Sequence, residues 1–333
     1  MIRISVIVPV RNEENSIREL LDGLINQTRR PDEIVITDGG STDSTAQIIE
    51  DYIRQGAPVR LIRTTGALPG RGRNLAAAEA RFDWLAFIDA GIRPEKNWLE
   101  TLAAKAEQTD TIDVVYGAWT PVTDSFFKEC AAIAYVPPPS NLNGLMVRPR
   151  SITSTLMRRE AWREVKGFPE HLRSGEDLVF MNRVESAGFR AVFEPLAQVH
   201  WDLRPTLYTT FKRFVVYSRN NIRAGLWRQW QLAILSRYSV LLVLLLVTAM
   251  IGLRWIWIPF VCWALMLLLR AVVAIRRNRD CYAATPIHNL KRLLVLAPLI
   301  SVLDAAAILG TIEWLVTDGF RRGRKAAEET NGA

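Results

Sequence analysis

A single acidic residue, Asp89, follows a short apolar segment of the sequence. Residues 84–88 are apolar without alternation, which is the pattern of a buried parallel strand covered on both faces. Asp89 stands at the expected carboxyl end of that strand, and Gly91 lies two positions later. Because ligands of open α/β sheets bind beyond the carboxyl ends of the strands, we expect Asp89 to contact a ligand.

Two further segments contain residues suited to an anionic ligand. Residues 66–74 are rich in Gly and include Arg71 and Arg73 ahead of an alanine-rich segment. Guanidinium groups beside backbone N–H groups at a helix start bind phosphate well, so we predict a phosphate-binding loop here. Asp38 is followed by two glycines, which allow positive φ angles and a close approach of a ligand to the backbone.

The elements that would position these residues alternate between strands and helices. Apolar residues have helical spacing at 13–27, and Asp43 is placed to cap a helix after it. Pro9 is expected to end the first strand. Strands are predicted at residues 2–8, 33–37, 59–63, 84–88, 112–119, 152–157 and 191–193, and helices at 94–106 and from 175. This alternation predicts an α/β fold with a doubly wound, mostly parallel sheet.

Four segments follow one another in an order and spacing that resemble a known family. Residues 6–14, 38–43, 87–91 and 175–177 are similar to the motifs of the family 2 inverting glycosyltransferases, which have a GT-A fold. The resemblance extends over about residues 3–205. It implies an enzyme that uses a nucleotide-diphosphate sugar as donor.

The resemblance also implies roles for individual residues. The expected catalytic pair is Glu176 and Asp177, with Asp177 as the general base, and Asp89 occupies the first acid of the Asp-X-Asp metal motif. The donor would be bound by Pro9, Val10, Arg11, Glu13, Asp38, Gly40, Arg71, Arg73, Asp89 and Ala90.

These roles agree with what the reaction requires. Breaking a sugar–phosphate bond releases a diphosphate, whose growing negative charge needs a divalent cation or arginines already in place. The hard oxygen ligand of Asp89 suits Mg²⁺ or Mn²⁺. Inversion needs one carboxylate to accept the proton of the attacking acceptor hydroxyl, and Asp177 is the expected one.

The sequence departs from the family pattern at two positions. Gly91 replaces the second acid of Asp-X-Asp, so a cation would need another ligand, and His200 is the nearest candidate. Gly39 replaces the second acid of the common Asp-Asp-Gly pattern, which reduces the expected nucleotide contacts.

Each candidate residue also has a structural interpretation that the sequence leaves open. Asp38 is suited to a turn, Ser174 and Asp177 have the spacing of a capping box, and Glu176 is favourable at any helix start. His200 lies beside an aromatic residue, where a packed histidine is common. Arg71 and Arg73 would then be solvated loop charges.

The composition changes along the chain: the N-terminal part is typical of soluble domains, and the C-terminal part is apolar. The chain has 333 residues and a net charge of +8, with its long apolar runs after residue 238. Residues 206–238 mix aromatic residues with basic ones and contain no acid, which predicts interfacial helices on an anionic membrane and no nucleic-acid partner. The first domain is expected to be residues 1–205. Three widely spaced cysteines predict reduced thiols.

Residues 239–276 contain two apolar stretches separated by Arg254, which predicts a transmembrane hairpin. Basic residues flank both outer ends, so we expect a multi-pass protein of the plasma (inner) membrane with its catalytic domain in the cytoplasm. Residues 277–333 hold a third hydrophobic stretch at 293–316 and a basic tail. The prolyl and acidic residues of that stretch favour a re-entrant or interfacial segment over a crossing.

Three functions fit these features. The first is a membrane-bound glycosyltransferase that transfers a sugar with inversion to a lipid-linked or polysaccharide acceptor. The second is an enzyme of the same fold that makes a polyprenyl-phosphate sugar, with lipid phosphate as the nucleophile. The third is a membrane scaffold that binds nucleotide, in which Gly91 indicates that catalysis has been lost. Donor, acceptor and linkage are not specified by these residues.

Overall fold

The computed structural model describes residues 1–142 and 144–319, which form two compact units. The first unit comprises residues 1–122 and 139–202, and the second comprises 123–138 and the chain from 203 onward. The expected domain of residues 1–205 is therefore interrupted. Its insertion is α5 (Phe126–Tyr135), which packs with helices of the second unit.

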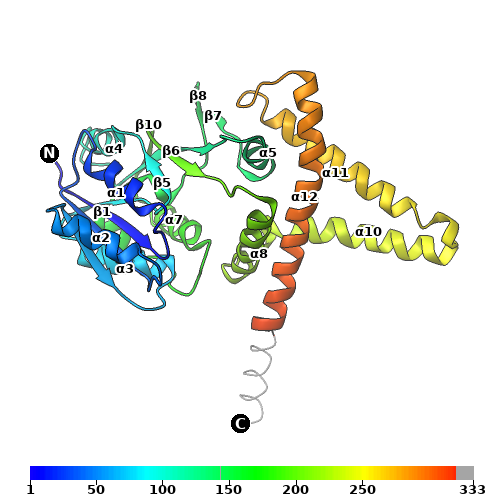
Figure 1. Cartoon of the computed structure of the whole chain (residues 1–333), viewed down its shortest axis with the longest axis horizontal. Helices are drawn as coiled ribbons and strands as arrows, with labels where there is room; N and C mark the ends of the chain where they lie inside the picture. Colours follow the sequence, from blue (N-terminus) through cyan, green and yellow to red (C-terminus); the bar gives the residue numbers. More distant parts are fainter. Residues whose placement is uncertain (143, 320–333) are drawn as a thin grey trace, which may run out of the picture. The chain divides into compact units, whose positions relative to one another are not determined.

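The first unit is built on an eight-stranded sheet with the order β3-β2-β1-β4-β9-β6-β10-β5 (Figure 1). All neighbouring strands are parallel except at β9 and β5, which run antiparallel to their neighbours. The strands are β1 (Ile4–Val10), β2 (Glu33–Asp38), β3 (Val59–Arg63), β4 (Trp84–Phe87), β5 (Ile92–Pro94), β6 (Val114–Val122), β9 (Thr155–Arg158) and β10 (Ala191–Asp202). The predicted mostly parallel α/β sheet is confirmed.

Helices cover both faces of this sheet because its central strands are apolar on both sides. In β1, Val6 and Val8 pack in the same cluster as helices α1, α2 and α4, whereas Ile7 packs with α3 and α7 on the other face. The helices are α1 (Ile17–Ile25), α2 (Thr45–Arg54), α3 (Pro69–Glu79), α4 (Trp98–Ala106), α6 (Arg159–Glu164) and α7 (Glu176–Ser186). A short hairpin of β7 (Ser140–Leu142) and β8 (Leu145–Val147) completes the unit.

Two boundaries differ from the sequence prediction in ways that affect the site. β1 continues through Pro9 to Val10, because β4 no longer pairs with β1 beyond Ile7 and a missing N–H is tolerated on a strand with one partner. α3 begins at Pro69, so Arg71 and Arg73 lie in a helix rather than in the predicted loop. Proline at the first helical position favours this early start.

The expected final strand of three residues is much longer. β10 runs to Asp202 with an irregularity between Glu194 and Gln198, and its end pairs with β5, which the sequence analysis missed. His200 is therefore in the sheet, opposite Arg93.

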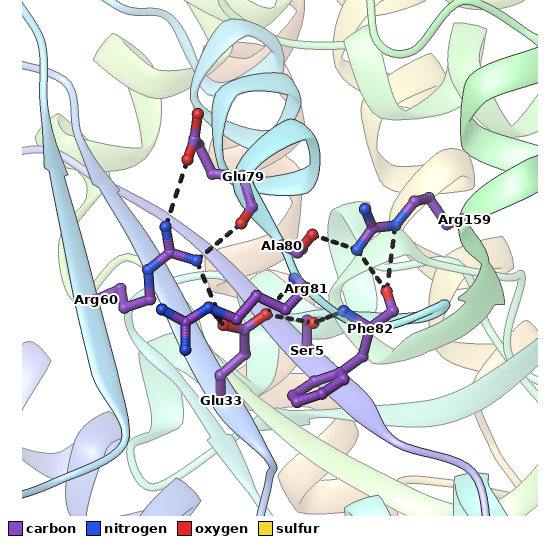
Figure 2. Close-up of polar contacts among 8 residues, drawn as sticks. All are labelled: Ser5, Glu33, Arg60, Glu79, Ala80, Arg81, Phe82 and Arg159. Carbon is purple, nitrogen blue, oxygen red and sulfur yellow. Dashed lines mark hydrogen bonds and ion pairs between the residues drawn. The ribbon is translucent and has the colours of Figure 1, made fainter.

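A buried carboxylate network stabilises the edge of the sheet opposite the strands' carboxyl ends (Figure 2). The side chain of Glu33, at the start of β2, accepts hydrogen bonds from the Ser5 hydroxyl at 2.7 Å and from the Arg81 N–H at 2.5 Å. Arg60 lies between Glu33 and the exposed Glu79. Because Glu33 is 4% exposed, its charge depends on these partners.

We expect Glu33→Ala to lower the free energy of unfolding of the first unit by about 2–4 kcal/mol, because buried donors lose their acceptor. Glu79→Ala removes the exposed partner of Arg60 and is expected to cost less than about 1 kcal/mol. Urea unfolding of both variants of the full chain measures the difference. Equal stability of the two variants would contradict this interpretation of the network.

The second unit consists of helices. They are α5, α8 (Leu207–Arg223), α9 (Trp227–Trp230), α10 (Leu232–Ile251), α11 (Ile258–Arg277) and α12 (Pro286–Trp314), with a 3-10 turn at Leu253–Trp255 and a π-helical turn at Leu315–Gly319. The segments Leu232–Ile251, Leu253–Arg277 and Pro286–Gly319 are long and apolar enough to cross a membrane. The described cysteines are unpaired.

The apolar segments differ from their predicted limits. α10 begins at Leu232, so its first turns lie in the segment expected to be interfacial. α10 and α11 form a hairpin (Figure 1). α12 is one continuous helix through Pro298, without the reversal of a re-entrant segment, and the interfacial alternative stays a prediction. The predicted basic tail, residues 320–333, lies outside the described residues.

Candidate active site

The loops that follow β1 and β2 are joined by reciprocal hydrogen bonds. The backbone N–H of Asn12 donates to the Ser41 hydroxyl at 2.9 Å, and that hydroxyl donates to Oδ1 of Asp38 at 2.6 Å. In return, the N–H of Thr42 donates to Oδ1 of Asn12 at 2.9 Å. Asn12 has a φ of 56°, a left-handed conformation that asparagine tolerates. The two loops therefore form one ordered rim at the carboxyl edge of the sheet.

A second set of bonds extends the rim to the start of α2. Oδ1 of Asp43 accepts from the N–H and the hydroxyl of Thr45, and its Oδ2 accepts from the N–H of Glu14. Ser44 rather than Asp43 is the N-cap residue, and it has no side-chain capping bond. The N–H of Glu13 donates to the Thr45 hydroxyl at 2.7 Å.

The glycine that departs from the family pattern is required by packing. A Cβ atom at Gly39 would lie 2.7 Å from the carbonyl oxygen of Ala67, which is a backbone atom. An aspartate therefore does not fit at this position without movement of the neighbouring loop. Gly40 has a φ of 89°, as the two-glycine pattern predicted.

Arg73 connects two of the candidate acids. Its Nη2 atom lies 2.6 Å from Oδ1 of Asp89, and its Nη1 atom lies 2.7 Å from Oε1 of Glu176. Arg73 is 3% exposed and Glu176 4%, whereas the Asp89 side chain is 32% exposed. The interpretation of Arg73 as a solvated loop charge is wrong, while Arg71 is exposed.

The start of α7 places Glu176 and Asp177 in the first helical turn. Gly175, with a φ of 79°, is the N-cap residue and offers no side chain, while the hydroxyl of Ser174 is buried without a partner in the described part of the chain. The capping-box interpretation of Asp177 is therefore wrong. Asp177 is half-buried, whereas Glu176 is almost fully buried.

The charges around this turn shift the pKa values of both acids. Burial raises the pKa of Asp177 and the Asp89 carboxylate adds to the rise, while the Arg73 guanidinium opposes it. Burial also raises the pKa of Glu176, against the opposing charge of Arg73. Burial lowers the pKa of Arg73, but the three surrounding acids outweigh it and raise the pKa overall. Arg73 therefore stays charged and partly compensates the acids.

Two polar atoms at this site are left unpaired in the described part of the chain, and one carboxylate oxygen remains for a cation. Nε of Arg73 and Oε2 of Glu176 are buried, and neither has a hydrogen-bond partner among the described residues. No group of three or more His, Cys, Asp or Glu side chains that could hold a metal occurs within residues 1–142 and 144–319. Mg²⁺ is commonly held by one or two carboxylates together with substrate phosphates and water, so Asp89 alone fits a cation that arrives with a diphosphate.

The other predicted residues lie at the end of β1, in the loops after β1 and β4, and in β10. Gly91 has a φ of 81° and open space where a Cβ would be. Nε2 of His200 lies 2.6 Å from Oε1 of Glu95, so the histidine already has a carboxylate partner, and metal binding by His200 stays a prediction. Pro9, Val10, Arg11, Glu13 and Ala90 occupy the end of β1, the loop after it and the loop after β4.

Asn74, which the sequence did not single out, holds the residue whose ring packs against Arg73. The side-chain amide of Asn74 bonds both the N–H and the carbonyl oxygen of Phe168, each at 2.9 Å. The Phe168 ring lies under Arg73, with 5.3 Å from Cζ to the ring centroid, and stacks on Phe180 of α7. Asn74 follows Arg73 directly, but its sequence neighbourhood contains no signal for this distant contact.

Comparisons with known proteins identify the first unit. A model described as glycosyl transferase family 2 matches residues 5–164. The poly(ribitol-phosphate) beta-N-acetylglucosaminyltransferase TarS of Staphylococcus aureus is 32% identical over 191 residues, covering 54% of this chain and 32% of that protein. The pre-mycofactocin glycosyltransferase of Mycobacterium tuberculosis is 27% identical over 225 residues, covering 64% of this chain and 46% of that protein. The chain spans less than half the length of both relatives.

Solved structures share the fold. Residues 1–349 of S. aureus TarS match with a TM-score of 0.51 at 21% identity, covering 95% of this chain and 92% of that chain. The mannosyltransferase PcManGT of Pyrobaculum calidifontis matches with a TM-score of 0.54 at 17% identity, covering 94% and 87%. The sheet is thus the predicted GT-A type. Residues 5–164 match the model of glycosyl transferase family 2, and the chain continues into helices long and apolar enough to cross a membrane.

Proposed function

We propose that the protein is a membrane-bound, inverting glycosyltransferase that moves a sugar from a nucleotide-diphosphate sugar to a lipid-linked or polysaccharide acceptor. The observation that carries this proposal is the Arg73 bridge between Asp89 and Glu176, with Asp177 beside it in the first turn of α7. A buried arginine suits the departure of a diphosphate, and a half-buried aspartate beside it suits the deprotonation of a hydroxyl.

The donor would lie along the rim formed by the loops after β1 and β2. Asp38 and the residues from Pro9 to Glu13 are proposed to contact its base and ribose, with Gly40 allowing close approach of the backbone. Arg71, which is exposed two positions before Arg73, is proposed to contact the diphosphate. PcManGT, which shares the fold, is described as a complex with GDP-Man and Mn²⁺.

Asp89 is the proposed protein ligand of a divalent cation, which would supply positive charge to the leaving diphosphate. Oδ1 of Asp89 accepts from Arg73, which leaves its other oxygen for the cation. Glu176 keeps Arg73 in place, so that the arginine and the cation together compensate the charge that develops. His200 remains a proposed additional ligand.

Asp177 is the proposed general base. A carboxylate accepts a proton from the acceptor hydroxyl only when it is itself deprotonated, so activity falls as the pH drops through its pKa. Since burial and Asp89 raise the pKa of Asp177, we expect the acidic limb of kcat/KM to lie above the ordinary aspartate value of about 3.9. A pH profile of transfer checks this, and a limb at or below that value would contradict the assignment.

The second unit is proposed to anchor the enzyme in the plasma (inner) membrane with the first unit in the cytoplasm. Basic residues precede α10 and end α11, which puts the outer ends of this hairpin on the cytoplasmic side by the positive-inside tendency. α8 carries aromatic and basic side chains such as Tyr208 and Lys212, which suit contact with lipid headgroups.

Asp89→Ala is expected to remove most of the effect of Mn²⁺ on donor binding, because it removes the proposed protein ligand of the cation. Calorimetry with the donor, with and without Mn²⁺, measures this. Asp83→Ala, at the exposed opposite end of the same strand, is the matched control and should keep the wild-type response. An unchanged response in Asp89→Ala would make Asp89 a structural acid.

A thermal-shift screen of nucleotide sugars, with and without Mn²⁺, tests the proposed function and identifies the donor. Stabilisation by one nucleotide sugar, followed by its turnover with membrane lipid present, supports a transferase. Binding without turnover of any nucleotide sugar would instead support the nucleotide-binding scaffold. Transfer directly to a lipid phosphate would support the polyprenyl-phosphate sugar synthase.

A further inference from the structure

A group of charged side chains lies inside the apolar helices of the second unit. Arg270 of α11 contacts both carboxylate oxygens of Asp304 of α12, with Nη2 at 3.0 Å from Oδ1. The Tyr238 hydroxyl of α10 donates to Oδ2 of Asp304 at 3.2 Å. Asp304 is 1% exposed, so these partners compensate a fully buried charge. Ionisable residues at such positions commonly mark functional sites.

The arginine next to Tyr238 has no such compensation. Arg237 makes no hydrogen bond or ion pair with any residue in the described part of the chain, and its Nε atom is buried. It lies within electrostatic reach of Arg270 and Asp304. The group therefore combines two arginines with one aspartate, and Arg270 is already paired. The remaining positive charge has no hydrogen-bonded anion among the described residues.

If α10 and α11 span the membrane, both arginines lie near the border between headgroups and hydrocarbon. Arg237 is five residues from the start of α10, and Arg270 is seven residues from the end of α11. At 1.5 Å per residue these positions are about 8 and 10 Å from the helix ends. Because α10 and α11 form a hairpin, those ends lie on the same side of the membrane.

A shallow, open cavity of about 280 Å³ lies beside Arg237. It is lined by Ser236, Arg237, Val240, Leu241 and Met266. Ser236 and Arg237 precede Val240 and Leu241 by one turn of α10, so the apolar part of the lining lies farther from the start of that helix. A ligand that matches this lining has an anionic head and a hydrocarbon chain.

We propose that this cavity binds the phosphate headgroup and the first chain carbons of a membrane lipid, with Arg237 as the main contact of the phosphate. Nε of Arg237 is buried while the residue as a whole is only partly buried, so its terminal guanidinium nitrogens remain free to contact a phosphate. The site rests on the proposed membrane anchoring of the second unit, but it goes beyond the proposed transferase activity and does not depend on that activity. A polyprenyl monophosphate and an anionic phospholipid both offer this chemistry.

The test is lipid binding to the full chain in detergent, measured by native mass spectrometry without any nucleotide sugar. The probes are farnesyl phosphate, dioctanoyl phosphatidic acid and zwitterionic dioctanoyl phosphatidylcholine. Wild type should bind at least one of the first two and discriminate against the third. Arg237→Gln should weaken that binding by about tenfold to a hundredfold, as expected for a charged hydrogen bond, and Arg237→Lys should weaken it less.

Two further variants keep the result interpretable. Ser236→Trp fills the cavity without changing charge and should also abolish binding. Arg254→Gln removes an exposed arginine at the far end of the same hairpin and should bind as wild type does. Preference for farnesyl phosphate assigns the site to polyprenyl phosphate, and preference for phosphatidic acid assigns it to bilayer phospholipid.

Wild-type affinity in Arg237→Gln or Ser236→Trp would overturn the proposal, as would equal losses in Arg254→Gln. Equal binding of phosphatidylcholine would also overturn it. Because the lipid-binding test contains no nucleotide sugar, its outcome does not affect the transferase proposal. A negative donor screen likewise does not affect the proposed lipid site.

Discussion

Asp177→Asn is expected to reduce sugar transfer by about 10²–10⁴-fold while donor binding remains within a few-fold of wild type. The amide has nearly the same shape as the carboxylate but does not accept the proton of the acceptor hydroxyl. Asp177 is half-buried in the first turn of α7, and Gly175 rather than Ser174 is the N-cap residue of that helix. Product formation and calorimetric donor affinity, measured on the same preparation, separate the two effects.

The matched control for Asp177→Asn is Glu185→Gln at the other end of α7. Glu185 is paired with Arg150 on the surface, and its substitution should leave transfer unchanged. Full activity in Asp177→Asn would contradict the assignment of the base. A mild loss would favour a lipid phosphate as nucleophile, because a phosphate oxygen needs little help from a base.

Arg73→Ala is expected to lower kcat/KM by about 10²–10³-fold, because the site loses a preorganised cation beside the leaving group. It should also destabilise the first unit by about 3 kcal/mol, since Glu176 would be left buried without its ion-pair partner. Arg73→Lys keeps the charge but not both contacts, so it should recover only part of each loss. Steady-state kinetics and urea unfolding measure the two effects.

Arg71→Ala provides the comparison, because Arg71 is two positions away in the same helix and is exposed. Its stability should match wild type, and its effect should be confined to donor affinity. If Arg73→Ala were as stable and as active as Arg71→Ala, the ion pairs with Asp89 and Glu176 would have no role in fold or site.

The sheet was predictable because its strands carry a strong local pattern. β2 and β3 follow their expected ranges closely, and β4 ends before Asp89 as the apolar run predicted. β5 and the long end of β10 were missed because their pairing is antiparallel and distant in sequence, and three residues carry no usable periodicity. The interruption of the first unit by α5 was missed because it depends on packing between α5 and helices that are distant in sequence.

At the site, residue types were predictable but their partners were not. The sequence gives Arg73, Asp89 and Glu176 no mutual signal, because they come from three separate segments whose contact depends on the register of α3 and α7. The start of α3 at Pro69 rotates Arg73 inward and leaves Arg71 outward. Gly39 is explained by the Ala67 carbonyl, a neighbour that only the folded chain brings close.

In the second unit, apolar length predicted helices that can cross a membrane, but the ends and the charged residues were harder to interpret. Pro298, Asp304 and Glu313 argued against a crossing when considered singly. In the structure Asp304 is compensated by Arg270 and Tyr238, and Glu313 pairs with Arg219, so a continuous helix accommodates them.

The most direct test of the proposed function is the configuration of the product. The full chain, supplied with the nucleotide sugar found by thermal shift and with membrane lipid, should release the nucleoside diphosphate and form a glycoside whose anomeric configuration is opposite to that of the donor. Proton NMR of the anomeric signal reports this. A product with the donor's configuration, or no nucleoside diphosphate released from any nucleotide sugar, would contradict the inverting mechanism and the role given to Asp177.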